Sequence, residues 1–152
     1  MITVTLTFDT LIKDLKEKSH LEVASIADPA VRYKLEAGTE KDPEIKRCLD
    51  EAATDLRGEI ARFLAVDQTP SSNNALPTVS AYVYDLNLSS RRSSSKADAL
   101  KNAFESYVVV RSLAKFHRSV GQAELSSMYE SQALAQAQSI NNLLYSKLPP
   151  QV

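Results

Sequence analysis

The two residues best suited to chemistry are Arg111 and His117, which are separated by five residues. A histidine can act as general base on a hydroxyl, and an arginine can stabilise charge that develops on a phosphate. Six steps along an α-helix turn through roughly 600°, which leaves the two side chains about 120° apart. They do not face one point on a single helix, so a second subunit would have to complete an active site built on them.

The segment Arg111-Ser-Leu-Ala-Lys-Phe-His117 resembles the R-x(4–6)-H motif of HEPN ribonucleases, which are also helical bundles. The resemblance implies RNA cleavage, with His117 as the base and Arg111 as the group that holds the phosphate. An arginine and a histidine at this spacing also occur often by chance. In the alternative interpretation they flank an apolar stripe near a helix C-terminus, where Lys115 and Arg118 join them and basic residues suit the helix dipole.

Other catalytic or metal chemistry has little to build on. The chain has two histidines, one cysteine and three glycines, and it contains no P-loop or dinucleotide-binding motif. A zinc site would need carboxylates placed by the fold. Cys48 is remote from both histidines in sequence, so we expect an ordinary helix residue and not a nucleophile. We also expect a solvated helix face to carry the acidic residues near the N-terminus, which are Asp9, Asp14, Glu17 and Glu22. We therefore predict no enzymatic activity, no metal and no cofactor.

The composition indicates one globular domain over residues 1–152. The 18 basic and 19 acidic residues leave a net charge of −1, which gives the whole chain no electrostatic basis for binding nucleic acid or an anionic membrane. Residues 1–8 have no basic region and no long apolar run, so we expect no signal peptide. No stretch of the sequence approaches the ~18 consecutive apolar residues of a membrane span, so we expect none. The prediction is a protein made in a reducing cytoplasm.

Hydrophobic periodicity predicts a mainly α fold. We expect a bundle of about four to five helices, a short N-terminal strand over 2–8, and a β-hairpin or extended arm near residues 78–88. A capping-box pattern at Ser19 indicates that the first helix restarts there. The predicted helices cover residues 9–26, 29–37, 42–64, 96–120 and 122–147, and Gly121 separates the last two as an antiparallel hairpin.

One segment between the helices is a candidate partner-binding arm. Four large apolar residues share one face at period two, between a loop over 67–78 and a polar linker over 89–95. Such a face must be buried, either on the chain's own helices or against an edge strand of another chain. We slightly favour the arm over an internal hairpin. Its candidate residues are Tyr82, Tyr84, Leu86, Leu88, Arg91 and Arg92.

Gly58 is unusual because it lies within the clearest amphipathic helix of the chain, over 42–64. A glycine inside a helix costs about 1 kcal/mol relative to alanine. We therefore expect it to let a neighbouring helix approach closely.

Three stretches carry a family resemblance: the helix over 42–64, the loop Ala75-Leu-Pro77, and the closing helices over 108–116 and 128–140. In this arrangement the chain resembles the head–tail connector or adaptor proteins of tailed phages, including the family typified by a small Mu-like prophage head-region protein. The resemblance covers about two thirds of the chain and consists of residue types rather than signature residues. The initial strand over 2–8 and the serine-arginine linker depart from it.

The resemblance implies a structural role. Proteins of this kind form a homo-oligomeric ring in the virion neck, join the portal protein to a tail or stopper protein, and line the channel through which DNA passes. Passing contact with DNA, but no sequence-specific nucleic-acid binding, is the expectation. A further alternative is a small DNA-packaging or regulatory helical protein, which predicts a basic surface that the net charge does not favour.

Overall fold

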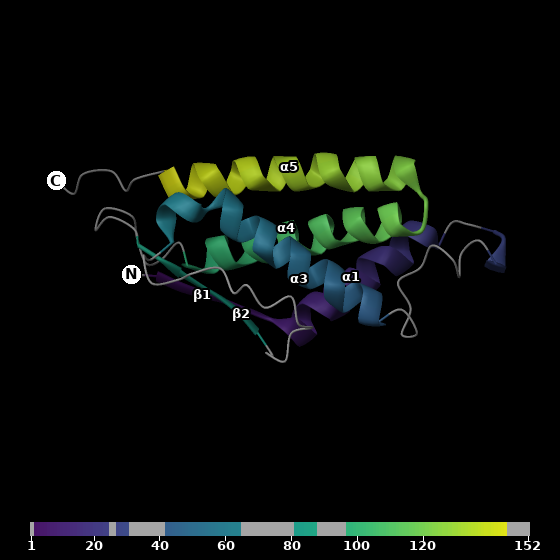
Figure 1. Cartoon of the computed structure of the whole chain (residues 1–152), viewed down its shortest axis with the longest axis horizontal. Coiled ribbons are helices and arrows are strands. Elements are labelled where there is room, and N and C mark those ends of the chain that lie inside the picture. The colour runs from purple at the N-terminus through teal and green to yellow at the C-terminus, as the bar shows by residue number, and fades with distance from the viewer. Residues whose placement is uncertain (1, 25–26, 31–41, 65–80, 88–96, 146–152) are drawn as a thin grey trace.

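The computed structural model describes residues 2–24, 27–30, 42–64, 81–87 and 97–145 (Figure 1). Two strands and four α-helices make up this part of the chain, which confirms the predicted mainly α class. In chain order they are β1 (Ile2–Thr7), α1 (Phe8–Val23), α3 (Asp42–Glu59), the short 3-10 helix η2 (Ala61–Phe63), β2 (Ala81–Leu86), α4 (Ala97–Ser119) and α5 (Ala123–Tyr145).

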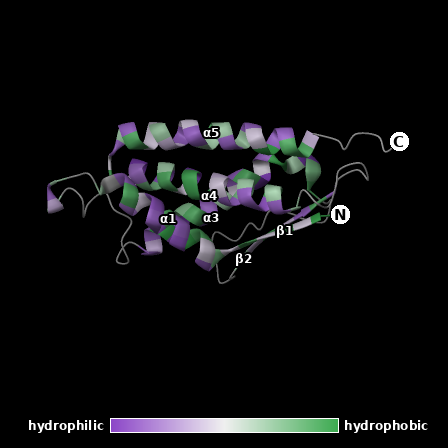
Figure 2. Cartoon of the chain, turned by 180° about the vertical axis from the view of Figure 1, so that it is seen from behind, coloured by the Kyte–Doolittle hydropathy of each residue, from purple (hydrophilic) through white to green (hydrophobic). Residues whose placement is uncertain are grey.

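Helix α4 is the centre of the fold. Helices α1, α3 and α5 and strand β1 all pack against it. Four consecutive residues, Tyr107–Val110, are buried, so α4 is covered around most of its circumference. The sheet lies along one side of the helices and α5 lies along the opposite side (Figure 1 and Figure 2).

The two strands pair with each other in antiparallel register although they lie far apart in the sequence. Ile2 pairs with Leu86, Val4 with Tyr84 and Leu6 with Tyr82, and all six side chains are buried. The Tyr84 hydroxyl donates a hydrogen bond of 2.9 Å to the carbonyl of Ala53 in α3. The segment interpreted as a local hairpin or a partner-binding arm is therefore half of the chain's own sheet.

The turn between α4 and α5 is formed as the sequence predicts. Gly121 has a positive φ of 79°, a conformation that favours glycine. The backbone N–H of Gln122 donates to the carbonyl of His117 at 2.8 Å, and that of Gly121 donates to Arg118 at 3.2 Å. These two bonds form a Schellman motif, which ends α4 and turns the chain back along it.

Two helix predictions need correction. Helix α1 runs through Ser19 without a restart, because Ser19 is completely buried inside a continuous helix. The helix predicted over 42–64 ends at Glu59 and continues as η2, since Ile60 leaves the helical conformation (φ −109°, ψ 16°). The helix predicted over 29–37 lies mostly outside the described residues.

Candidate functional site: a groove between α3 and α5

The structure places Arg111 and His117 in different surroundings. His117 is completely buried. Its ring stacks on that of Tyr129 of α5, with the ring centroids 5.4 Å apart and an interplanar angle of 7°, and it contacts Phe116 edge-on. Arg111 is partly exposed on the side of α4 that faces α3. In this conformation His117 cannot reach a substrate in solution, so the two residues do not form a shared site.

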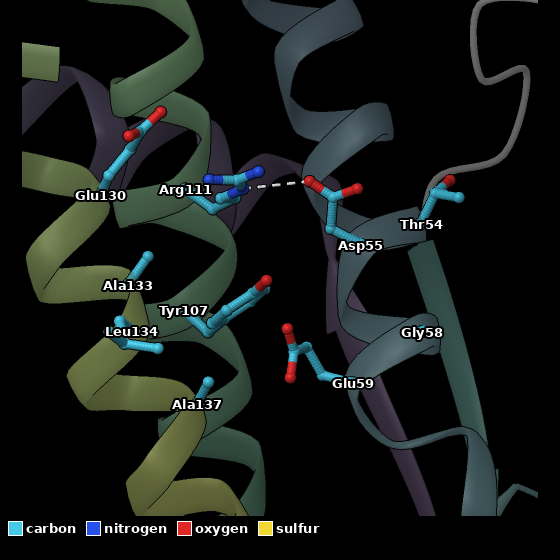
Figure 3. Close-up of a pocket in the computed structure, with 10 residues that line it drawn as sticks. All are labelled: Thr54, Asp55, Gly58, Glu59, Tyr107, Arg111, Glu130, Ala133, Leu134 and Ala137. Carbon is cyan, nitrogen blue, oxygen red and sulfur yellow. Dashed lines mark hydrogen bonds and ion pairs between the residues drawn. The ribbon is translucent and has the colours of Figure 1, made fainter. Parts of the chain in front are cut away.

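Arg111 is held by an ion pair between α4 and α3. Its Nε lies 3.0 Å from Oδ2 of Asp55, and Nζ of Lys115 lies 3.1 Å from the same oxygen (Figure 3 draws the bond from Arg111). Burial opposes the charge on Arg111, but the hydrogen bond and the charge of Asp55 outweigh it, so the pKa of Arg111 is raised. Arg111 therefore serves first to fix α4 against α3.

Beside this ion pair is a groove of about 500 Å³. Helices α3 and α5 form its two walls, and α4 forms its floor (Figure 3). The residues that line it are Thr54, Asp55, Gly58, Glu59, Tyr107, Arg111, Glu130, Ala133, Leu134 and Ala137. The α5 wall is made mainly of small or apolar side chains, whereas carboxylates lie along the rim.

The acidic residues that line the groove differ in whether a basic residue forms an ion pair with them. Asp55 is paired with Arg111 and Lys115, and Glu130 is paired with Arg118 across the α4–α5 turn. Glu59 is exposed, and among the described residues it forms no ion pair. Its carboxylate is therefore available to a cation from outside.

Tyr107 points into the same space as Glu59 (Figure 3). Burial, and then the nearby charge of Glu59, raise the pKa of Tyr107 to about 12. The phenol is therefore neutral at ordinary pH, and its hydroxyl can donate or accept a hydrogen bond at the floor of the groove.

Gly58 leaves the groove open at the α3 wall. A Cβ atom built on Gly58 would meet nothing within 4 Å, apart from its own helix. The close helix approach expected from the sequence is therefore not made within the described chain. A helical glycine weakens α3, and the internal packing gives no reason for it.

The outer face of α5 beside the groove lacks charged residues over most of its length. No residue between Ser131 and Tyr145 is charged. Leu134, at the middle of α5, is 63% exposed and also lines the groove. Interface centres are depleted of charged residues, whereas ordinary solvent-facing helices are rich in them. This face of α5 therefore has the charge-poor composition of an interface centre, whereas the groove beside it is also lined by three carboxylates and Arg111.

The other candidate residues do not join the groove. Tyr82, Tyr84 and Leu86 face the chain's own core as part of β2, while Leu88, Arg91 and Arg92 lie outside the described residues. Cys48 is buried, and burial raises the pKa of its thiol to about 12, which suits a packing residue and not a nucleophile.

The described part of the chain holds neither a metal cluster nor a membrane span. Within it, no group of three His, Cys, Asp or Glu residues is placed to hold a metal ion. None of the helices described there is long and apolar enough to span a bilayer. Comparison with family models, curated proteins and solved structures finds no match to this chain.

Sequence reasoning missed Glu59 and Leu134 as site residues. Two signals pointed toward them: a glycine inside an amphipathic helix, and a long run without charge in the last helix. Neither signal says that α3 and α5 come together on α4, because that depends on long-range packing.

Proposed function

We propose that this protein is a structural component that works by binding other protein chains, and that it serves as a head–tail connector of a tailed phage or prophage. The observation that carries the protein-binding part is the groove between α3 and α5 beside the uncharged face of α5, with Leu134 63% exposed. The family resemblance of the helices supplies the phage context. The partners would be the portal protein and a tail or stopper protein.

Burial supports binding over catalysis. The one histidine on α4 is sealed against Phe116 and Tyr129, and the arginine beside it is held in an ion pair with Asp55. A general base must come within hydrogen-bond reach of the proton it removes. The groove instead offers apolar side chains, the hydroxyls of Thr54 and Tyr107, and the carboxylate of Glu59, which suit a polypeptide.

The test of this proposal is quantitative mass spectrometry of purified particles from the source of the sequence, with the portal protein as the reference. A ring stacked on the portal should give a fixed ratio of roughly one copy per portal subunit. Particles assembled without the chain should be heads that fail to join tails. Absence of the chain from intact particles, or normal tail joining without it, would overturn the proposal.

A further inference from the structure

Helix α1 also exposes a large apolar side chain. Leu21 is 74% exposed, the most exposed large hydrophobic side chain of the described residues. Lys18 lies three positions earlier, so the two side chains share one face of α1. Among the described residues Lys18 makes no ion pair. We call Lys18 and Leu21 together the α1 knob.

The α1 knob and the groove lie on different surfaces of the molecule. Lys18 borders a hollow that is also lined by Val109 of α4, whereas Tyr107 of α4 lines the groove. Residues two apart on a helix point roughly 200° apart. A single copy therefore presents the knob on one side of α4 and the groove on nearly the opposite side.

The two surfaces are complementary in charge, and each exposes an apolar side chain. The knob carries an apolar side chain and a cation, and the groove carries exposed Leu134, the open space at Gly58 and the uncompensated carboxylate of Glu59. Gly58 and Glu59 are adjacent, just as Leu21 and Lys18 are neighbours on their helix face. An apolar contact and an ion pair can then form side by side.

We infer that the occupant of the groove is the α1 knob of a second copy of this chain. Leu21 fills the space over Gly58 and Leu134, and the Lys18 ammonium pairs with the Glu59 carboxylate. Because knob and groove are different surfaces, the contact is head-to-tail, so each copy keeps one free knob and one free groove. Repetition produces a ring or an open chain of copies. The inference rests on the proposed function and deepens it by assigning the contact between subunits.

The first experiment is sedimentation velocity of the full chain at concentrations up to about 1 mM, which detects association with a Kd of about 1 mM or below. Wild type should sediment faster as concentration rises. Leu21→Ser and Glu59→Lys should each stay monomeric and folded, since both positions are exposed. Lys18→Glu should also stay monomeric, and Lys13→Glu, which makes the same charge change on the same helix, is its matched control and should associate like wild type.

Mixing the two variants gives the decisive result. Leu21→Ser keeps its groove and Glu59→Lys keeps its knob, so an equimolar mixture should form a heterodimer and nothing larger. The double variant Lys18→Glu/Glu59→Lys restores opposite charges and should recover association. Wild type that stays monomeric, a Leu21→Ser variant that associates like wild type, or a mixture that stays monomeric would each overturn the inference.

The outcomes remain separable from those of the particle experiment. If the chain is present in particles but its knob and groove variants behave like wild type, the connector proposal stands and this subunit contact falls. If the chain associates through the knob but is absent from particles, the contact stands and the connector proposal falls.

Discussion

Helices α3 and α5 both pack on α4, yet their outward faces differ in kind. Helix α3 has nine charged residues among 18, and Arg47 pairs with Glu44 and Glu51 on its exposed side. Helix α5 has two, Glu124 and Glu130, among 23. On this side of α3 the charges are solvated, and those of Arg47, Glu44 and Glu51 are paired within the helix.

The face of α5 from Ser131 to Tyr145 has no such charges and lies next to the open groove. Its exposed residues are small, amidic or apolar, and Leu134 stands out among them. The two helices therefore differ in the surface they leave to solvent: α3 exposes charged side chains, whereas α5 exposes mostly uncharged ones. The sheet side is closed by buried side chains, and the α5 side is left with surface that a second chain can cover.

The largest expected effect is the difference in stability loss between a substitution in the buried core and one on the exposed face of α5. Leu6→Ala removes a completely buried side chain of β1 and should lower the free energy of unfolding by about 2–5 kcal/mol. Leu134→Ala, the matched control on α5, should change it by no more than about 0.5 kcal/mol. Urea unfolding followed by circular dichroism measures both. Equal losses would show that Leu134 also belongs to the core, and the comparison would fail.

A smaller effect is expected in alkali, through Tyr107 at the floor of the groove. Its pKa is raised to about 12 by burial and by Glu59, whereas a tyrosine in the unfolded chain titrates near pH ~10. Below pH ~10 the phenol is protonated in both the folded and the unfolded state. Between about pH 10 and 12 it stays protonated only in the folded state. The free energy of unfolding therefore falls as pH rises, by at most about 1.4 kcal/mol per pH unit. Tyr107→Phe should reduce the slope of the free energy of unfolding against pH in that window. The same substitution should leave the slope near pH ~8 unchanged. An unchanged slope above pH ~10 would contradict the burial of this phenol.

The smallest expected effect concerns Gly58 and has the opposite sign. Its φ is not positive and a Cβ there meets open space, so Gly58→Ala should raise the free energy of unfolding by about 0.5–1 kcal/mol. Gly121→Ala is the contrast: its φ of 79° strains any side chain, so we expect destabilisation of about 1 kcal/mol. Thermal unfolding of the two variants measures the difference. Destabilisation by Gly58→Ala would mean that the groove is closed in the isolated protein.

The helices could be predicted from the sequence because each carries its own periodicity and end signals, such as Gly121 after α4. The partner of β2 could not. The apolar residues of β2 required burial, but nothing local distinguishes β1 of the same chain from a strand of another. The capping-box pattern at Ser19 misled for a similar reason, since tertiary burial keeps α1 helical through that residue.

The groove was predicted less well than the fold. The sequence predicted that a neighbouring helix of the same chain packs closely against Gly58. In the structure a Cβ atom on Gly58 meets nothing within 4 Å, apart from its own helix. Arg111 was singled out for chemistry, and it lines the groove as part of an ion pair with Asp55. Only the packing of α3 and α5 on α4 brings Glu59 toward Leu134, and sequence periodicity holds no information on that arrangement.

The measurement that tests the central claim most directly is site-specific photo-crosslinking of the purified full chain, with the reactive residue placed at position 134 or at position 47. Both positions are exposed, one on the α5 face and one on the charged face of α3. Position 134 should yield adducts of two copies, joined to the peptide that contains Leu21, and position 47 should yield none. Equal cross-linking from both positions, or no adduct between copies from position 134, would contradict the claim that the α5 side is an interface.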